Sequence, residues 1–440
     1  MRAKSIRNPG NDKSIGLEIH RLMTELYPLC RSITGDGFRK TLEILRRHVP
    51  LEIREVPSGT RMFDWTVPKE WNIRDAYIKN PKGKKIVDFR KSNLHVMSYS
   101  IPIKTRISLK DLKKHLFTLP AHPDWVPYKT SYYEENWGFC LSHRQFLALE
   151  KGDYEVVIDS SLEDGFLTYG ELLLPGEKEE EVLISAHACH PSLANDNLSG
   201  VGLATMMAKH LGSVGHRFSY RFLFIPGTIG SITWLCLNEE KARKIIAGLV
   251  VSGVGDAGNI TYKKSRRGDA EIDRAAAHVL EHSGQPYRLL DFHPYGYDER
   301  QFCSPGFNLP VGRISRTPYG DYPEYHTSAD NLEFVTPDFL TESYEKIRAI
   351  LNVLEGNRIY LGRNQKCEPQ LGKRGLYAFA GAHELALLWA LNLSDGDNSL
   401  LDIAERSGLP FGAVQEAAQR LAKAGLLVER SEPLAVDRRS

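Results

Sequence analysis

The stretch VLISAHACHPSLANDNLSGVGLATMMA, residues 182–208, carries the most informative pattern in the chain. An apolar, strand-like run ends just before His187, and Asp196 follows ahead of a segment of small residues that suits the start of a helix. Open α/β sheets bind their ligands at the carboxyl ends of parallel strands. The stretch therefore predicts a strand, a loop with functional side chains, and a helix.

The region around this stretch, about residues 171–360, alternates strand-like and helix-like runs. The strand-like runs are ELLLPG, EEVLISAHA, RFSYRFLFIP, IIAGLVVSGVG and LPVGRIS, and the helices are expected at 200–211, 231–244, 269–282 and 337–354. Such alternation indicates βαβ crossovers and a mainly parallel sheet with helices on both faces. The predicted fold class is α/β, and 171–360 is the expected metal-binding domain.

Three further regions differ in texture. Residues 1–50 have apolar positions at helical spacing and predict two helices that pack on the catalytic domain. Residues 51–170 contain short β-rich runs separated by Pro, Gly and Asn, which predicts a β-rich accessory domain, preceding or inserted. After a linker at 357–372, residues 375–440 predict three short helices followed by the run GLLVER. This last pattern is typical of a winged helix-turn-helix domain.

Composition restricts the partners and the location. A length of 440 residues favours two or three domains, and a net charge of +2 gives no reason for wholesale binding to nucleic acid or to an anionic membrane. No run approaches the roughly 18–20 apolar residues that cross a bilayer, and the polar start lacks the apolar middle of a signal peptide. We therefore expect a cytoplasmic protein, and its six scattered cysteines predict reduced thiols.

The predicted winged helix offers a thin footprint for DNA. Its second helix presents Gln415, Gln419, Arg420 and Lys423 as its polar reach. A packing or homodimerisation module is favoured over a nucleic-acid partner. A transcriptional regulator acting through this tail stays open as a third alternative.

A second motif, GDYPEYHTSADNLEFVTPDFL at 320–340, adds His326 in a polar loop. Two imidazoles and a carboxylate are ligands that a zinc ion prefers. Alternatives remain for each residue, because His187 could be a packed strand-end histidine and Asp196 a helix N-cap. His190 competes with His187 as a ligand, and Cys189 could be a soft ligand or simply packed.

These motifs resemble the M28 family of zinc aminopeptidases, which show a histidine, then DNxSG, then a late YHT stretch. YDERQF at 297–302, followed by PGFNLPVG, is similar to the SDHxPF and GxP of that family. The resemblance spans about residues 171–355. It implies a zinc-exopeptidase-like fold in which His187, Asp196 and His326 hold the metal and the substrate is small or peptide-like.

The resemblance breaks where that family carries its catalytic and metal-binding glutamates. In FLFIPGTIGSITWL these positions are Gly227 and Thr228, and a further aspartate ligand would fall near Ser252, with Asp256 four residues later. Because two ligands are absent, one zinc ion is expected rather than two. By the layout of the family, the candidates for the catalytic base are Asp298, Glu299 and Glu324. Asp298 could instead orient a ligand histidine, and Glu324 could be solvated surface.

Substrate-binding candidates flank these motifs. Arg300 and Arg266, with Arg267 beside it, would suit a carboxylate or another anion, and Tyr325 adjoins the late histidine. Surface solvation is the alternative for the arginines. An aromatic roof over the metal could come from the β-rich domain, where the candidates are Trp65, Trp71, Tyr132, Tyr133 and Trp137; the alternative is an aromatic core.

The chain as a whole resembles bacterial aminopeptidase-like proteins of the DUF4910 and DUF2172 type, with an inserted β domain and a winged-helix tail. RSITGDG, FDWTVPKEW, YYEENWGFCL and DERQFCSPGFNLPVG carry this resemblance. The leading hypothesis is a metal-dependent hydrolase of an amide or peptide-like bond in a small substrate. The main alternative is a degenerate aminopeptidase fold that binds a ligand or partner without catalysis.

Overall fold

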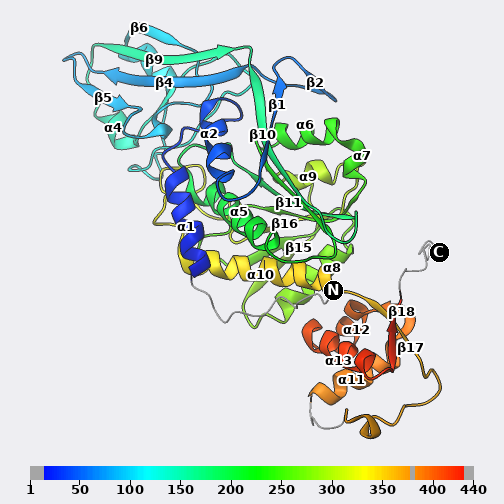
Figure 1. Cartoon of the computed structure of the whole chain (residues 1–440). Helices are drawn as coiled ribbons and strands as arrows, with labels where there is room; N and C mark the ends of the chain where they lie inside the picture. Colours follow the sequence, from blue (N-terminus) through cyan, green and yellow to red (C-terminus); the bar gives the residue numbers. More distant parts are fainter. Residues whose placement is uncertain (1–13, 377–381, 431–440) are drawn as a thin grey trace. The chain divides into compact units, whose positions relative to one another are not determined.

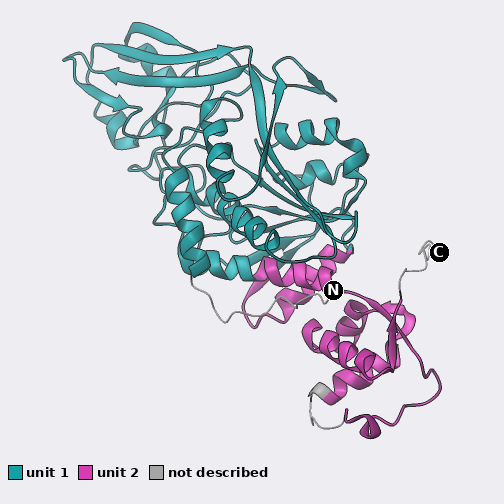
Figure 2. Ribbon diagram, viewed as in Figure 1, with its two compact units in different colours: residues 1–270, 288–345 teal, residues 271–287, 346–440 magenta. Residues whose placement is uncertain are grey.

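The computed structural model describes residues 14–376 and 382–430 and divides into two compact units (Figures 1 and 2). Unit 1 contains residues 1–270 and 288–345, and unit 2 contains residues 271–287 and 346–440. Residues 1–13, 377–381 and 431–440, which fall in the ranges predicted for the N-terminal helices and the winged helix, lie outside the described residues.

The core of unit 1 is an eight-stranded sheet. Its order is β1 (Glu52–Pro57), β10 (Phe166–Leu174), β12 (Ser219–Ile225), β11 (Glu181–His187), β13 (Ile245–Val251), β16 (Val311–Ser315), β14 (Ile260–Lys263) and β15 (Tyr287–Leu290). The four middle strands, β12 to β16 in this order, are mutually parallel, and β1, β10 and β14 join antiparallel. Every residue of β11 is buried, as expected of a parallel strand covered on both faces. The predicted mainly parallel α/β sheet is confirmed.

Helices flank this sheet on two sides, with α1 and α5 on one side and α6, α7 and α9 on the other (Figure 1). The helices of unit 1 are α1 (Ser14–Leu26), α2 (Asp36–Leu45), α5 (Gly200–Leu211), α6 (Ile229–Leu237), α7 (Glu239–Ala242) and α9 (Glu299–Phe302). The α10 helix (Pro337–Gly356) begins in unit 1. Gly16 of α1 lies so close to α10 that an added Cβ would stand 2.0 Å from the Pro337 carbonyl oxygen. A glycine is needed there for α1 to reach its packing position.

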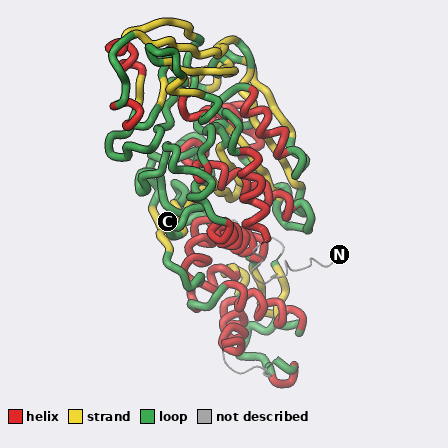
Figure 3. Tube along the Cα trace, turned by 90° about the vertical axis from the view of Figure 1, so that its left-hand side faces the viewer, coloured by secondary structure: helices red, strands yellow, loops and turns green. Residues whose placement is uncertain are grey.

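The accessory sheet is formed by residues inserted between β1 and β10. Its order is β5 (Lys85–Asp88), β4 (Glu70–Lys79), β9 (Asp153–Glu163) and β6 (Ile103–Ser108). Short elements surround it: β2 (Arg61–Met62), β3 (Trp65–Thr66), η1 (Asn93–His95), α3 (Leu109–Leu112), η2 (Lys113–His115), β7 (Leu116–Phe117), β8 (Phe139–Cys140) and α4 (His143–Leu147). Figure 3 shows these strands and short helices at the top of the view.

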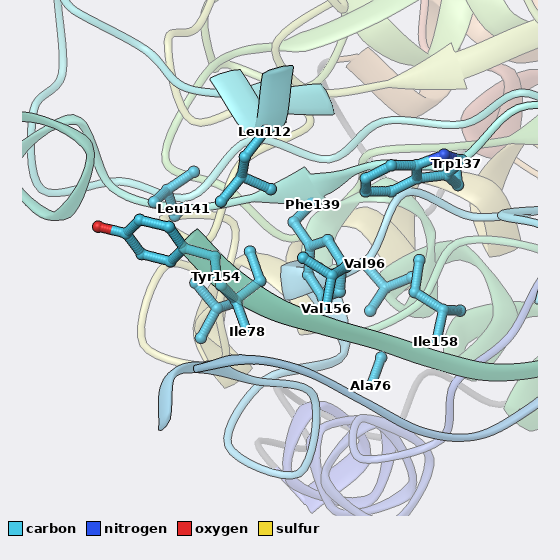
Figure 4. Close-up of a cluster of buried hydrophobic side chains, with 11 residues drawn as sticks. Ala76, Ile78, Val96, Leu112, Trp137, Phe139, Leu141, Tyr154, Val156 and Ile158 are labelled. Atoms are coloured by element: carbon cyan, nitrogen blue, oxygen red, sulfur yellow. The ribbon is translucent and has the colours of Figure 1, made fainter. Parts of the chain in front are cut away.

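A separate hydrophobic core supports the accessory sheet. Phe139, Trp137 and Tyr154 pack with aliphatic side chains from β4 and β9 in this core (Figure 4). The chain enters and leaves the insertion through β1 and β10, which pair antiparallel, with Glu52 opposite Glu171. Both ends of the range 51–170 that the sequence assigned to a β domain therefore lie in the large sheet.

Unit 2 contains a three-stranded sheet, ordered β18-β17-β19, with helices beside it. Its elements are α8 (Glu271–Glu281), β17 (Ile359–Gly362), η4 (Gly372–Arg374), α11 (Ala382–Leu393), β18 (Asp395–Ser399), α12 (Leu400–Ser407), α13 (Phe411–Lys423) and β19 (Leu427–Glu429). The predicted winged helix is present. Within this unit, Phe411 at the start of α13 donates its backbone N–H to His278 of α8, at 3.0 Å.

A helix that crosses a membrane must be both long and apolar. Among the helices that the structure describes, none combines the length and the apolarity needed to span a bilayer.

Candidate metal centre

The three predicted ligands meet at one carboxylate. His187 ends β11, Asp196 lies in the π-helical turn η3 (Ala194–Ser199) before α5, and His326 lies in the loop before α10. His187 Nε2 is 2.8 Å from Asp196 Oδ1, and His326 Nε2 is 3.0 Å from Asp196 Oδ2. The structure thus brings together side chains that are far apart in the sequence.

His190 joins this group as a fourth member. Its Nδ1 lies 3.4 Å from Asp196 Oδ2. The ligand atoms of His187, His190 and Asp196 all lie within 4.8 Å of one another, which suits a shared metal ion. Sequence reasoning weighed His190 against His187 as alternatives; the structure places both at the carboxylate.

Several atoms of this group lack the partners that buried polar atoms normally have. Within the described residues, Asp196 Oδ2, His190 Nδ1 and His326 Nε2 are buried, and although they lie close to one another, none makes a hydrogen bond of normal geometry. Unsatisfied buried groups are rare in folded proteins and point to a missing ion, water or ligand. Nitrogen and oxygen lone pairs converging on one point are the donor set of a transition-metal site.

The protonation states also suit a metal. Burial alone would raise the pKa of Asp196, but the neighbouring imidazoles of His190, His187 and His326 outweigh it and hold that pKa well below its usual value. Burial lowers the pKa of His190 to about 3, so its imidazole is neutral at pH 7. An ionised carboxylate and a neutral imidazole are the forms that bind metal ions.

Other side chains hold the loop that presents Asp196. The carboxylate of Asp330 accepts the backbone N–H groups of Asn195 and Asp196, at 2.5 and 2.9 Å. The Asn197 side chain donates to the carbonyl oxygens of His187 and Val251, at 3.2 and 3.0 Å. Asp330 is four residues after His326, so the motif that supplies one ligand also positions another.

The N-terminal helices contribute a buried arginine to the same loop. Arg31, in the turn between α1 and α2, donates from Nε to the His190 carbonyl oxygen at 2.9 Å. Cys189 is buried, and burial raises the pKa of its thiol to about 12, while its Sγ accepts the Gly227 N–H at 3.2 Å. Cys189 is therefore a packed thiol at neutral pH.

The three predicted base candidates have different surroundings. Asp298 is fully buried, and its Oδ1 accepts the Thr228 N–H at 2.7 Å and the Ser231 hydroxyl at 2.8 Å. Burial raises the pKa of Asp298, while nearby His187 opposes the rise. Glu299 is also buried but is ion-paired with Lys263, at 2.9 Å. Glu324 is half-buried, and its carbonyl oxygen accepts from the backbone and side chain of the turn that follows.

The predicted substrate-binding residues also have different surroundings. Tyr325 stacks on the His326 ring, with centroids 3.9 Å apart. Arg300 reaches Thr228, with 3.4 Å between Nη2 and Oγ1. Arg266 is exposed and bonds through Nη1 to the Asn308 side chain at 3.0 Å; Arg267 donates to the Asn308 carbonyl oxygen.

The positions of the absent glutamates lie beside the metal ligands. A Cβ added at Gly227 would stand 3.6 Å from Cys189 Sγ and 3.8 Å from His187 Cβ, which are ordinary contacts. A β-carbon at position 227 would therefore fit beside His187. Asp256, considered as a ligand replacement, is bonded to Asn195 at 2.9 Å and to Thr317 at 2.5 Å, and so supports the loop instead.

The accessory domain covers the metal group through Tyr128, which the sequence did not single out. Its ring lies edge-on to His190 and His326, with centroids 5.2 and 5.0 Å away. Its hydroxyl is 2.5 Å from the hydroxyl of Tyr132, which links one predicted roof residue to the site. Its backbone N–H donates to the His326 carbonyl oxygen at 2.8 Å. This bond restrains His326, whose φ of 55° is unusual for a residue with a side chain.

The remaining roof candidates lie elsewhere. Trp137 belongs to the accessory core, and Trp71 is buried with its Nε1 donating to the Ser100 carbonyl oxygen at 2.9 Å. Trp65 and Tyr133 are exposed and contact each other edge to face. The only sequence signal for Tyr128 was its place just before the tyrosine pair of YYEENW.

Comparisons with known proteins place the two parts of the chain in families. The model of the DUF4910 family, described as a domain of unknown function, matches residues 20–357. A winged helix-turn-helix model matches residues 358–429.

One relative is similar over nearly the full length. A Clostridium acetobutylicum protein named "Putative polysaccharide biosynthesis protein with aminopeptidase-like domain" is 55% identical over 95% of this chain and 97% of its own. A crystal structure of a "putative peptidase" from the same species, also 55% identical, superimposes with a TM-score of 0.93 over 96% of this chain and 98% of that one.

More distant structures share the fold. A zinc aminopeptidase from Bacillus subtilis gives a TM-score of 0.57 at 12% identity, covering 76% of this chain and 94% of that one. An M28 peptidase precursor from Shewanella amazonensis gives 0.55 at 14% identity, covering 81% and 97%. The chain therefore belongs to the DUF4910 family and joins an M28-aminopeptidase-like fold to a C-terminal winged helix.

Proposed function

We propose that this protein is a metal-dependent hydrolase of an amide or peptide-like bond in a small substrate. One zinc ion would be held by His187, Asp196 and His326, with His190 as a further ligand. The observation that carries the proposal is the convergence of three imidazoles on one fully buried, ionised carboxylate whose Oδ2 has no hydrogen-bond partner in the described parts of the chain. A structural cluster would satisfy that oxygen.

The residues around the site have separable roles. When bound, zinc supplies Lewis acidity toward the carbonyl and toward a water molecule. Tyr128 and Tyr325 cover His326 on two sides and limit the access of bulk water. The scissile group would be positioned by the metal ligands His187 and Asp196. Asp330 holds the loop that carries Asp196.

Asp298 is the favoured proton carrier. It is anchored to the backbone of Thr228, next to the open space at Gly227, where the related family has its catalytic glutamate. Burial raises its pKa, which makes the carboxylate more basic and suits a proton acceptor. Glu299 is less suited because Lys263 binds its carboxylate, and Glu324 remains an alternative on the rim.

The metal is tested first. Purified protein should contain about one zinc per chain, and the His187→Ala and His326→Ala variants should lose most of it, whereas His48→Ala, outside the site, should not. Chelator-sensitive cleavage of aminoacyl and N-acyl amide probes should follow the metal content. Because the relative from Clostridium is named for polysaccharide biosynthesis, N-acetylated sugars belong among the probes.

The base is tested separately. Asp298→Asn should retain zinc but lose activity by roughly 100-fold or more, as for other general bases. Glu324→Gln serves as the matched control and should retain most activity. Full zinc occupancy with no cleavage of any probe by the wild-type protein would favour the non-catalytic binding alternative.

DNA binding has a structural argument against it. The first amide of α13, the helix that a winged helix inserts into the major groove, is bonded to His278, and Phe411 is buried. Retention of the protein on DNA at low salt would nevertheless restore that alternative, because phosphate contacts are strongest there.

A further inference from the structure

We propose that Arg300 binds an anionic group of the substrate, a carboxylate or a phosphate, beside the metal centre. This inference rests on the proposed function, because it names the class of substrate that the same site would accept. It starts from the position of Arg300 and from the hydrogen-bonding capacity that its side chain leaves unused.

The position follows from three linked residues. Gly227 lies against His187, since an added Cβ would contact the His187 side chain at 3.8 Å. Thr228 follows it and starts α6 with a φ of 64°, an uncommon backbone conformation for a residue with a side chain. Arg300, in α9, places Nη2 3.4 Å from the Thr228 hydroxyl. The guanidinium therefore stands one residue away from the space beside the metal ligand.

The guanidinium of Arg300 is underused. Its side chain makes one long hydrogen bond, to Thr228, and its Nε is buried without a partner among the residues that the structure describes. No carboxylate of the described chain lies within ion-pair distance of it. A guanidinium has five N–H donors, so most of the donors of this half-buried side chain are left for a ligand. Arg221, by contrast, is buried and satisfied by two glutamates.

Lys263 and Arg313 form a second layer of positive charge around Glu299, the residue before Arg300. Lys263 and Arg313 are both buried and share one carboxylate: the Glu299 Oε1 is 2.9 Å from Lys263 Nζ and 3.9 Å from Arg313 Nη1. Arg313 Nε also lacks a partner in the described structure. Two buried cations thus share the single carboxylate of Glu299, which balances only one of them and favours an anion from outside the chain.

The substitutions at 227 and 228 act in the same direction. The related aminopeptidases carry two glutamates there, which would repel an anionic group on the substrate. Gly227 and Thr228 remove both negative charges and open space beside His187. Without the two acids, Arg300 presents its positive charge next to Thr228, and its free N–H groups can bind an anion. The region around positions 227, 228 and 300 therefore attracts anionic groups instead of cationic ones.

The rings around the second layer restrict what can enter. The Arg313 guanidinium lies over the rings of Tyr297 and Tyr319, 5.5 and 5.6 Å from their centroids. Tyr297 in turn stacks near His187, at 5.1 Å. Arg313 is therefore enclosed between aromatic rings, while Arg300, only half-buried, is the cation that a substrate can reach.

The test measures binding rather than turnover. Zinc-loaded protein is titrated calorimetrically with N-acetylglycine and with N-acetylglycinamide, two amides that differ in one charge. N-acetyl-O-phosphoethanolamine is the phosphate probe. We expect the wild type to bind at least one anionic probe roughly tenfold more tightly than the neutral amide, as charge-assisted hydrogen bonds allow. Which acid binds more tightly identifies the source of the anion.

Variants assign the preference to Arg300. Arg300→Gln should abolish the preference for the acid, and Arg300→Lys should keep part of it. Arg243→Gln, which changes an exposed arginine just after α7, should leave the preference unchanged. Zinc content and the thermal unfolding midpoint are measured for each variant to exclude misfolding.

Two results would overturn the inference. One is equal or undetectable binding of acid and amide by the wild type. The other is an acid preference that survives in folded Arg300→Gln, which would place the carboxylate on the metal itself. Neither depends on catalysis. A zinc-loaded protein that cleaves no probe but prefers acids through Arg300 would refute the proposed function and retain this inference.

Discussion

Buried charged groups lie at both ends of strand β11, but only those at its start have all their hydrogen-bond partners within the described protein. At its start, Glu181 receives two bonds from Arg221, at 2.6 and 2.7 Å, and Glu171 accepts the Trp234 indole N–H at 3.0 Å. At its end, His187 faces Asp196, whose second oxygen has no hydrogen-bond partner in the described chain. A buried cluster that satisfies itself stabilises the fold, whereas one that does not is prepared for something else.

The largest expected effect is at the unsatisfied end. Asp196→Asn should reduce bound zinc from about one equivalent to nearly none and lower kcat/KM by about 1,000-fold or more, because the carboxylate is the shared ligand. Metal analysis and probe hydrolysis measure both quantities. Normal zinc content in this variant would mean that the metal binds elsewhere and that the two ends of β11 do not differ in function.

The satisfied end should respond in stability instead. Glu181→Gln leaves Arg221 with one carboxylate and should lower the free energy of unfolding by about 3 kcal/mol, since a broken buried ion pair leaves an uncompensated charge. Urea unfolding measures this loss, and zinc content should not change. The control is Glu179→Gln, which removes an exposed partner of Lys244 and should cost much less than Glu181→Gln, because solvent screens an exposed pair. Equal losses in the two variants would contradict the assignment.

A buried, satisfied histidine in unit 2 extends the comparison to pH. Burial and the neighbouring His282 lower the pKa of His278 to about 4, from 6.5 in the unfolded chain. As the pH falls from 6.5 toward 4, the unfolded chain binds a proton that the folded unit does not, so stability is lost. Between pH 7 and 5 the loss should be about 1–2 kcal/mol.

His278→Gln tests this assignment, because its side-chain oxygen can accept the Phe411 N–H but does not titrate. At pH 5, α13 should exchange hydrogen for deuterium faster in the wild-type protein than in this variant. At pH 7 the two proteins should exchange at the same rate. Identical exchange in the two proteins at pH 5 would contradict it.

The smallest effect probes the open space beside the metal group. Gly227→Ala should change the free energy of unfolding by less than about 1 kcal/mol, because its Cβ meets only ordinary contacts. Gly16→Ala, whose Cβ would overlap the Pro337 carbonyl oxygen, should cost about 2 kcal/mol or more. Thermal unfolding compares the pair. A large loss for Gly227→Ala would mean that the space is closed.

The sequence predicted the features that depend on local pattern. The apolar run before His187 predicted strand β11, and the small residues after Asp196 predicted helix α5. The order of the motifs carried the resemblance from which the fold was inferred. The M28 resemblance, rather than spacing, suggested that His326 would join them. The placement of all three at one carboxylate agrees with that expectation, while their roles remain a prediction.

The features that were missed depend on tertiary contacts. His190 was treated as a competitor because one sequence cannot show that two histidines face the same oxygen. Tyr128 lies about 200 residues from the loop that it covers, and no local pattern marks it. For the same reason, Arg266 and Arg300 look alike in the sequence, yet one contacts a surface loop and the other Thr228.

The segment at Tyr128 also forms a short β-bridge to the histidine loop: Pro127 pairs with Thr327, and Val126 exchanges bonds with Ser328. The insertion is thereby bonded to the backbone at His326 and at the two residues that follow it. A substitution that shifts the inserted sheet should therefore also move that imidazole, and excising residues 61–163 would remove the backbone bonds that restrain it.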